Sequence, residues 1–207
     1  MGARDSAPPR MRLLLASSNP GKLREYSELA TGSPLELDLI PDFRGIPPFD
    51  ESARTFAENA AGKALHYSRF RTEIVLADDS GLVVPALGGA PGVRSARYAG
   101  PNATDSENVR KLLRAMKGRR DGERRARFLC VIAIAQRGRA LVVVSDFVEG
   151  LLAERPSGTR GFGYDPIFIV PELGCTFAEA SSEDKNRLSH RGKAFRKLRQ
   201  VLGGSVV

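Results

Sequence analysis

The chain has 207 residues, of which 42% are hydrophobic and 27% are charged; these shares are close to globular averages and exclude a disordered or fibrous chain. The longest apolar run, Leu129 to Ala135, is far shorter than the roughly 20 residues that cross a membrane. Basic residues outnumber acidic ones by 32 to 24, so the net charge favours a polyanionic partner, which composition alone does not identify.

Two further features concern the first ten residues and the two cysteines. Residues 1–10 mix charge, serine and proline without the apolar core of a signal peptide. Cys130 and Cys175 stand alone, which argues against a disulfide framework and a cysteine-based zinc site. We therefore expect a cytoplasmic protein with a flexible tail at residues 1–10 and a single domain over residues 11–207.

The predicted domain begins with a strand, a tight turn and a helix. The apolar run Met11 to Ala16 predicts the strand, and Lys22 to Ala30 reads as the helix. Asn19 is a preferred N-cap residue, and Pro20 suits the first helical position. Leu35 to Ile40 predicts a second strand, followed by a proline-rich loop.

A second helix and a third strand follow. Thr55 and Glu58 have the spacing of a capping box, which predicts that a helix begins there. Ile74 to Ala77 predicts a buried strand that ends abruptly at Asp78, and Leu82 to Leu87 continues as a strand or extended segment.

The second half of the chain contains a predicted antiparallel hairpin. Thr104 caps a helix that runs to about Lys117, and the arginine-rich stretch Arg119 to Arg127 predicts a solvated loop. Phe128 to Gln136 and Ala140 to Val148 are β-branched, apolar runs on either side of a short connection, as in a hairpin.

The chain closes with a short strand and a helix. Ile167 to Val170 predicts the strand, and Ser182 to Leu202 predicts one long helix. Because strands and helices alternate early and a hairpin comes later, the elements predict an α/β fold with a mixed sheet.

The turn from Ser17 to Lys22 is a candidate anion site. A helix N-terminus presents unpaired backbone N–H groups, and serine, asparagine and lysine add donors, so a phosphate fits there. The same residues are equally consistent with a capped helix that carries a surface lysine.

The acidic pair Asp78-Asp79 is a stronger candidate because it follows a buried strand. Carboxylates at the carboxyl end of such a strand face a ligand crevice in open α/β sheets, and Mg²⁺ prefers oxygen ligands of this kind. The alternative is a turn in which the two carboxylates cap backbone N–H groups. Asp50 and Glu51 form another acidic cluster, which is either a second metal contributor or a polar approach to the Thr55 helix.

Two later segments are candidates for binding a base. Gly161 to Pro166 places two aromatic residues beside a carboxylate, which suits a base or a plain turn with two core rings. Lys185, Ser189 and His190 share one face of the closing helix, although a solvated surface is the usual explanation for so basic a helix.

Together these segments resemble the inosine triphosphate pyrophosphatase family, also called Ham1-like. The match begins at LLLASSNPGKLRE, continues through TFAENAAGKA and is densest in LADDSGLVVPALGGAPGVRSARYAG. It closes with GFGYDPIFIVPELGCTFAEASSEDKNRLSHRGKAFRKL, so it covers nearly the whole chain from Met11 to Leu202 in the family's order.

The resemblance implies a mixed central β-sheet flanked by helices, in two lobes with a nucleotide-binding cleft between them. It also implies Mg²⁺-dependent hydrolysis of nucleoside triphosphates with altered purines, chiefly ITP, dITP and XTP, to the monophosphate and pyrophosphate. Such proteins are usually homodimers. The partners that we expect are therefore the nucleotide and a second copy of the chain, and neither nucleic acid nor a membrane.

Carried over residue by residue, the resemblance makes Asp79 the general base and a metal ligand. Asp50 is a second metal ligand, at the place of a metal-binding glutamate in a bacterial relative. The triphosphate and base contacts implied are Ser17, Ser18, Asn19, Pro20, Gly21, Lys22, Lys63, Ser80, Phe162, Gly163, Tyr164, Asp165, Lys185, His190 and Arg191. Two alternatives remain: a Maf-like pyrophosphatase acting on other modified nucleotides, and a basic nucleic-acid-binding protein.

Overall fold

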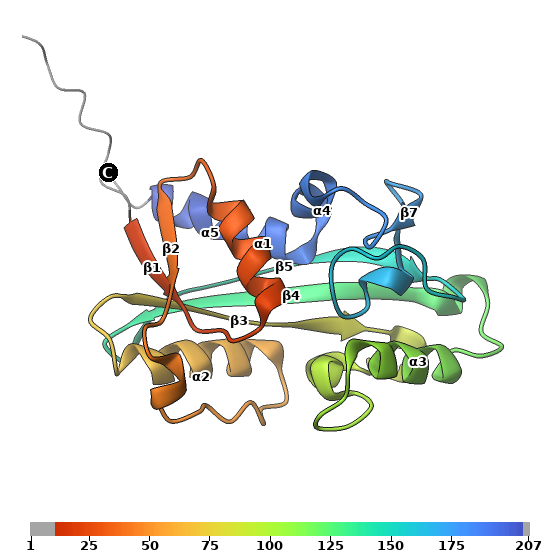
Figure 1. The fold of residues 1–207 in the computed structure, drawn as a ribbon, viewed down its shortest axis with the longest axis horizontal. Coiled ribbons are helices and arrows are strands. Elements are labelled where there is room, and N and C mark those ends of the chain that lie inside the picture. Colours follow the sequence, from red (N-terminus) through yellow and green to blue (C-terminus); the bar gives the residue numbers. More distant parts are fainter. Residues whose placement is uncertain (1–10, 205–207) are drawn as a thin grey trace, which may run out of the picture.

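A seven-stranded sheet forms the centre of the molecule and separates two layers of helices. The computed structural model describes residues 11–204, so the tail expected at residues 1–10 lies outside the described residues. The strand order is β2-β1-β3-β4-β5-β6-β7. Helices α2 (Phe56–Ser68) and α3 (Asp105–Ala115) lie on one side of the sheet, and α1 (Pro20–Ala30), α4 (Ser182–Leu188) and α5 (His190–Gly204) lie on the other (Figure 1).

The first three strands run parallel. Strand β1 (Met11–Leu15) pairs with β2 (Leu35–Leu39) on one side and with β3 (Ile74–Val83) on the other. The two crossovers carry α1 and α2, as parallel neighbours require. Both helices begin where the sequence predicts, because the Asn19 side chain caps α1 and Thr55 forms a complete capping box with Glu58.

Strand β3 is longer than the sequence predicts. It does not end at Asp78 but continues through Asp78, Asp79 and Ser80 to Val83, and it pairs antiparallel with β4 (Arg125–Gln136) along that length. The turn considered for the acidic pair is therefore absent. Pairing with β4 satisfies the backbone groups, so the polar side chains do not end the strand. The residues after it, Pro85–Leu87, form a 3-10 helix.

The predicted hairpin is present and longer than expected. Strand β4 pairs with β5 (Arg139–Leu152) over nearly their whole lengths. The arginine-rich segment between α3 and β4 is not a simple solvated loop, because its last residues belong to β4. In addition, Arg124 donates hydrogen bonds to the backbone carbonyls of Leu152 and Ala153 and so ties this segment to the end of β5.

The C-terminal part departs from the prediction in one respect. The short strands β6 (Phe168–Val170) and β7 (Cys175–Thr176) complete the sheet. The closing helix is two helices rather than one, because Ser189 has the extended ψ of 155° and separates α4 from α5. This break changes the direction of the chain just before His190 and Arg191.

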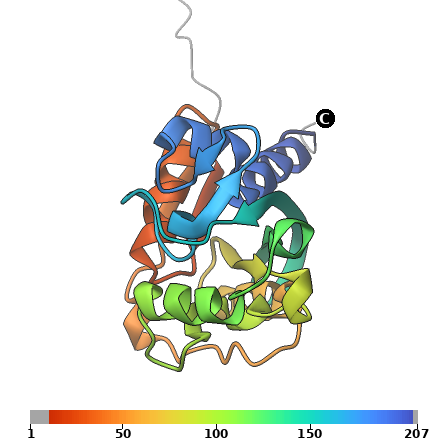
Figure 2. The ribbon, with the colours of Figure 1, turned by 90° about the vertical axis from the view of Figure 1, so that its right-hand side faces the viewer.

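The sheet and its two helical layers bury the apolar residues in three clusters. One lies between the sheet and α2, one between the sheet and α1 with α5, and one near α3 with β6. Figure 2, turned by 90°, shows the same two layers with the twisted sheet between them. Across residues 11–204, every helix is too short or too polar to span a bilayer.

Candidate functional site

A cavity of about 390 Å³ opens beside the middle of β3 and collects side chains from distant parts of the chain. Both polar and aromatic side chains line it. Most of the predicted site residues line it: Ser17, Ser18, Asn19, Lys22, Lys63, Asp79, Ser80, Phe162, Gly163, Tyr164, Asp165, Lys185, His190 and Arg191. Pro20, Gly21 and Asp50 are not part of the wall, and Glu25 and Glu51 are.

The N-terminus of α1 forms one end of the cavity. The Asn19 side chain accepts hydrogen bonds from the backbone N–H groups of Gly21 and Lys22, at 2.9 and 3.1 Å. The Ser17 hydroxyl accepts one from the Asn19 N–H at 3.2 Å. The cap and the anion-binding features therefore coexist, since the positive end of the helix dipole still faces the cavity.

The two adjacent aspartates point to opposite faces of the sheet, as consecutive strand residues do. Asp79 lies on the face covered by α2, where Asn59 donates to its Oδ2 at 2.9 Å. Asp78 lies on the face covered by α1 and α5, near Lys22 and Arg191. Only Asp79 reaches the cavity wall.

The environment of Asp79 favours proton uptake. Burial raises the pKa of its carboxyl, and the hydrogen bond from Asn59 opposes this only in part. The charge of Glu51 raises the pKa further, whereas the charges of Lys22 and Lys63 lower it. A carboxylate with a raised pKa is better matched to act as a general base near neutral pH than an exposed one.

The acidic cluster before α2 contributes one residue to the cavity. Glu51 lines the wall, and its Oε1 is 2.5 Å from the Lys63 ammonium. Asp50, the residue for which the sequence suggests a metal role, is exposed and lies outside the wall.

Asp78 is one of the most buried charged groups in the protein, at 1% exposure. Its Oδ1 accepts a hydrogen bond from the Lys22 ammonium at 2.9 Å. Burial alone would raise the pKa of Asp78, but the charges of Lys22, Arg191 and Lys63 lower it far below its usual value. Asp78 is therefore ionised throughout the physiological range.

Arg191 lies at the centre of a buried network of charges. Its Nη1 donates to Glu25, and its Nη2 donates to the Ser80 hydroxyl at 2.9 Å. The Lys185 ammonium lies 2.5 Å from both Glu25 Oε1 and Asp165 Oδ2. The network thus joins α1, α4 and α5 to the loop that precedes β6, and its opposite charges offset the cost of burial.

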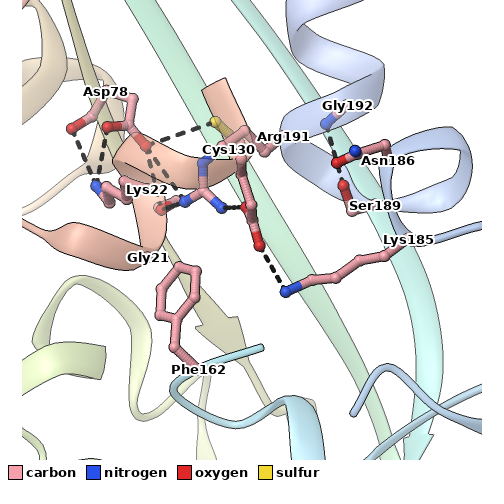
Figure 3. Close-up of polar contacts among 12 residues, drawn as sticks. Gly21, Lys22, Asp78, Cys130, Phe162, Lys185, Asn186, Ser189, Arg191 and Gly192 are labelled. Atoms are coloured by element: carbon pink, nitrogen blue, oxygen red, sulfur yellow. Dashed lines mark hydrogen bonds and ion pairs between the residues drawn. The ribbon is translucent and has the colours of Figure 1, made fainter. Parts of the chain in front are cut away.

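Phe162 forms the aromatic wall together with Phe128. The Phe162 ring packs so closely on Gly21 that a Cβ atom there would lie 2.5 Å from the ring. The Lys185 ammonium and the Arg191 guanidinium lie 5.2 and 5.6 Å from its centroid, and Figure 3 shows the ring beside Gly21 and below the guanidinium. Gly21 thus serves the site by leaving room for the aromatic ring.

His190 completes this end of the cavity. Its ring stacks on Phe128, with centroids 4.8 Å apart and planes 9° apart. Burial lowers the pKa of His190 well below its usual value, and the charges of Arg191 and Lys185 add to this effect. The ring is therefore neutral at physiological pH.

The oxygen ligands at the α2 side of the cavity suit Mg²⁺ better than zinc. Between residues 11 and 204, no group of three or more His, Cys, Asp or Glu side chains is placed to form a complete metal cage. Mg²⁺ is usually held by one or two carboxylates, with water and substrate phosphates filling the other positions. Asp79 and Glu51 provide such a pair.

Two residues that contact the site were not predicted from the sequence. Glu25 pairs with Arg191 across 166 positions, and Asn59 orients Asp79 across 20 positions. Both lie on helices whose sequence shows only ordinary polar residues. The one available signal was position, since Glu25 lies one helical turn after Lys22 and Asn59 one turn before Lys63.

Comparisons with known proteins place the chain in a family. Residues 13–201 match the model of the Ham1 family. The chain is 47% identical to a dITP/XTP pyrophosphatase of Geobacillus kaustophilus, covering 93% of this chain and 96% of the relative. A relative of the same description from Methylococcus capsulatus is 46% identical, over 94% of this chain and the whole of the relative.

Solved structures show the same fold. A HAM1 protein from Coxiella burnetii matches with a TM-score of 0.83 and 43% identity, covering 94% of this chain and 100% of that one. The Ham1 protein of Staphylococcus aureus matches with a TM-score of 0.81 and 38% identity, covering 93% of this chain and 98% of that one. The mixed α/β architecture predicted from the sequence is thereby confirmed.

Proposed function

Because the chain belongs to the Ham1 family, we propose that it hydrolyses nucleoside triphosphates with altered purines, chiefly ITP, dITP and XTP. The products are the nucleoside monophosphate and pyrophosphate, and the role is to cleanse the cytoplasmic nucleotide pool. One observation carries the proposal: a single cavity is lined by the Asp79 carboxylate, by the cations Lys22 and Lys63, and by Phe162 and Arg191.

The triphosphate lies at the α1 end of the cavity. The hydroxyls of Ser17 and Ser18 line this end, and the positive end of the α1 dipole favours an anion there. The backbone N–H groups of Gly21 and Lys22 already donate to the Asn19 side chain. Lys22 and Lys63 supply the two nearby positive charges. These groups offset the negative charge that develops on the leaving pyrophosphate.

Asp79 acts as the general base on a water molecule that attacks the α-phosphorus. Asn59 holds the carboxylate by one oxygen, while the Ser80 N–H donates to the other at 2.9 Å. The carboxylate is therefore oriented before the substrate binds, which is what proton abstraction requires.

Mg²⁺ is the cofactor that these residues fit, and Asp79 and Glu51 would hold it. When bound, the ion neutralises phosphate charge and lowers the pKa of a coordinated water. Glu51 is preferred to Asp50 because it faces the cavity.

The base lies between Phe162 and His190, at the other end. In the part of the chain that the structure describes, Arg191 Nε and His190 Nδ1 are buried and have no hydrogen-bond partner. Both residues line the cavity. Arg191 Nε is a fixed donor, so it pairs with the 6-keto oxygen of hypoxanthine or xanthine and opposes the 6-amino group of adenine. Each unmatched buried group costs about 1–3 kcal/mol.

The decisive experiment is a substrate panel with pyrophosphate detection. We expect kcat/KM to be highest for ITP, dITP and XTP, and much lower for ATP and the pyrimidine triphosphates. A preference for modified pyrimidine nucleotides would instead indicate a Maf-like activity. Tight, steeply salt-dependent binding of DNA or RNA without hydrolysis would indicate a nucleic-acid-binding protein. Either result would overturn the proposal.

We also propose that the protein is a homodimer that associates through β5. Leu141, Val143, Phe147 and Leu151 alternate along one face of this strand and are 40–49% exposed. The opposite face packs against α5, and β5 pairs with β6 only at Leu151 and Leu152. An apolar stripe on a strand with a largely unpaired edge favours association with a second copy.

A further inference from the structure

We propose that Asp78 is a positioning residue for the reaction, which holds Lys22 at the phosphate end and Arg191 at the base end of the cavity. Asp78 itself does not line the cavity. This inference rests on the proposed function and adds a residue that acts on the substrate only through two others.

The geometry of the Asp78 carboxylate supports this role. Oδ1 accepts a hydrogen bond from Lys22 Nζ at 2.9 Å, and Oδ2 lies 3.4 Å from Arg191 Nη2. Figure 3 shows the carboxylate between the ammonium and the guanidinium. Among residues 11–204, Asp78 is the only carboxylate that forms ion pairs with both cations.

The backbone of the same residue holds a third cation. The carbonyl oxygen of Asp78 accepts a hydrogen bond from Lys63 Nζ at 3.2 Å and a longer one from Lys22 Nζ at 3.4 Å. One strand residue therefore contacts cations from α1, α2 and α5. These three helices approach β3 from both faces of the sheet.

Side-chain flexibility explains why such a residue is needed. Free lysine and arginine side chains populate many rotamers, and ordering them at the moment of substrate binding costs entropy. A buried, ionised partner orders them beforehand. Lys22 has three donor hydrogens, so it can keep Asp78 and still bind a phosphate oxygen.

The role of Asp78 differs from that of Glu25. Glu25 pairs with Lys185 and Arg191, which both lie at the base end. Asp78 links Arg191 to Lys22, and the two belong to different ends of the cavity. Loss of Asp78 is therefore expected to disturb phosphate binding and base selection together.

A double-mutant cycle tests this inference with Asp78→Asn, Lys22→Met and the combined variant. If Asp78 acts through Lys22, each single change lowers kcat/KM for ITP by about 100-fold, because misplacement of a positioning group has effects of that size. The combined variant is then worse than Lys22→Met alone, because Asp78 also holds Arg191, but by clearly less than the product of the two single effects, since interacting residues are not additive. Multiplication of the two effects would overturn the proposal.

Selectivity is the second readout, because a purely structural role would not change it. The ratio of kcat/KM for ITP to that for ATP is expected to fall in Asp78→Asn and to stay unchanged in Lys22→Met. Each rate is measured well below the melting temperature of the variant, so that the molecules compared are folded. An unchanged ratio in Asp78→Asn would contradict the link to Arg191.

Control measurements distinguish a specific role of Asp78 from a nonspecific effect of substitution, from misfolding and from failure of the proposed function. Asp38→Asn removes an exposed aspartate that pairs with Arg12 at 2.7 Å, and it should leave both readouts at the wild-type level. If Asp78→Asn does not fold, comparison of the combined variant with Lys22→Met still tests the inference. The combined variant removes the charges of both Asp78 and Lys22, so neither is left buried without the other. If the wild-type protein releases no pyrophosphate from any purine triphosphate, the proposed function fails rather than the role of Asp78.

Discussion

The Asn59 side chain donates a hydrogen bond of 2.9 Å to Oδ2 of Asp79, and both residues are buried. This contact joins the middle of β3 to α2 and turns the carboxylate toward the cavity. Among residues 11–204, no cation forms an ion pair with Asp79, whereas its neighbour Asp78 pairs with Lys22 and Arg191. The two adjacent carboxylates therefore have different surroundings because they lie on opposite faces of the sheet.

The first prediction concerns catalysis. Asp79→Asn should lower the rate of pyrophosphate release by about 1,000-fold, the size of a general acid–base contribution. The fold should survive, because burial disfavours the charged form that the substitution removes. The rate with ITP and the thermal melting curve measure the two effects. Near-normal turnover would remove Asp79 from the mechanism.

The second prediction concerns the metal and uses two neighbouring residues as a matched pair. Glu51→Gln should raise the Mg²⁺ concentration for half-maximal activity at least about 10-fold, as loss of a carboxylate from a metal site does. Asp50→Asn should leave it unchanged, because Asp50 lies outside the cavity. A Mg²⁺ titration of both variants at saturating ITP measures this. The reverse result would restore Asp50 as the ligand.

The third prediction concerns the aromatic wall. Gly21→Ala places a methyl group 2.5 Å from the Phe162 ring, and we expect kcat/KM for ITP to fall about 10-fold or more, as overpacking of one to two kcal/mol implies. Phe162→Ala should mainly raise KM, since it removes the stacking surface for the base.

The double variant shows whether Gly21→Ala lowers activity through a clash with the Phe162 ring or for another reason. In Gly21→Ala/Phe162→Ala the methyl group meets no ring, so kcat/KM should equal that of Phe162→Ala alone. If Gly21→Ala lowers activity equally with and without the ring, the glycine matters for another reason, such as the start of α1.

The fourth prediction follows from the buried His190. Burial lowers the pKa of this ring in the folded state, whereas the unfolded chain takes up a proton below a pH of about 6.5. The stability linked to His190 is therefore complete above that pH and is lost as the pH falls. The expected slope is about 1.4 kcal/mol per pH unit until the folded protein is protonated too.

Denaturant unfolding between pH 5 and pH 7.5 measures this slope. His190→Gln should flatten it, because glutamine does not titrate. The difference between the slopes of the wild type and His190→Gln isolates the contribution of this ring. Equal slopes in the wild type and His190→Gln would show that the ring is not held neutral.

The fifth prediction concerns the assembly. Phe147→Glu places a charge in the middle of the apolar stripe on β5 and should convert a dimer to a monomer at micromolar concentration, because an unpaired interfacial charge is costly. Sedimentation velocity measures the change. Phe70→Glu, at another exposed aromatic residue, should leave the dimer intact. A wild-type monomer at high concentration would exclude this interface.

Local signals predicted the starts of α1, α2 and α3, because capping is a short-range interaction. Asn19, Thr55 and Thr104 cap α1, α2 and α3 as their sequence context indicates. The hairpin was also predictable, since β-branched runs with a short connection favour one arrangement. By contrast, the break at Ser189 carries no helix-breaking residue and was not predictable from composition.

The length of β3 shows why other features depended on tertiary structure. By composition, Asp78 and Asp79 end a strand, yet pairing with Ile132 and Val131 of β4 continues it. The buried charge of Asp78 is tolerated because Lys22 and Arg191 come from segments 56 and 113 positions away. Contacts between residues so far apart in the sequence cannot be predicted from a local pattern.

The sequence by itself determined the family, the order of the elements and most of the residues around the cavity, because these follow from short motifs and local preferences. The tertiary structure alone decided that Glu51 rather than Asp50 lies on the cavity wall, that Glu25 pairs with Arg191, and that Asn59 orients Asp79. The physical reason is the same in each case. The position and charge of a buried polar group depend on partners that only folding brings within a few ångströms.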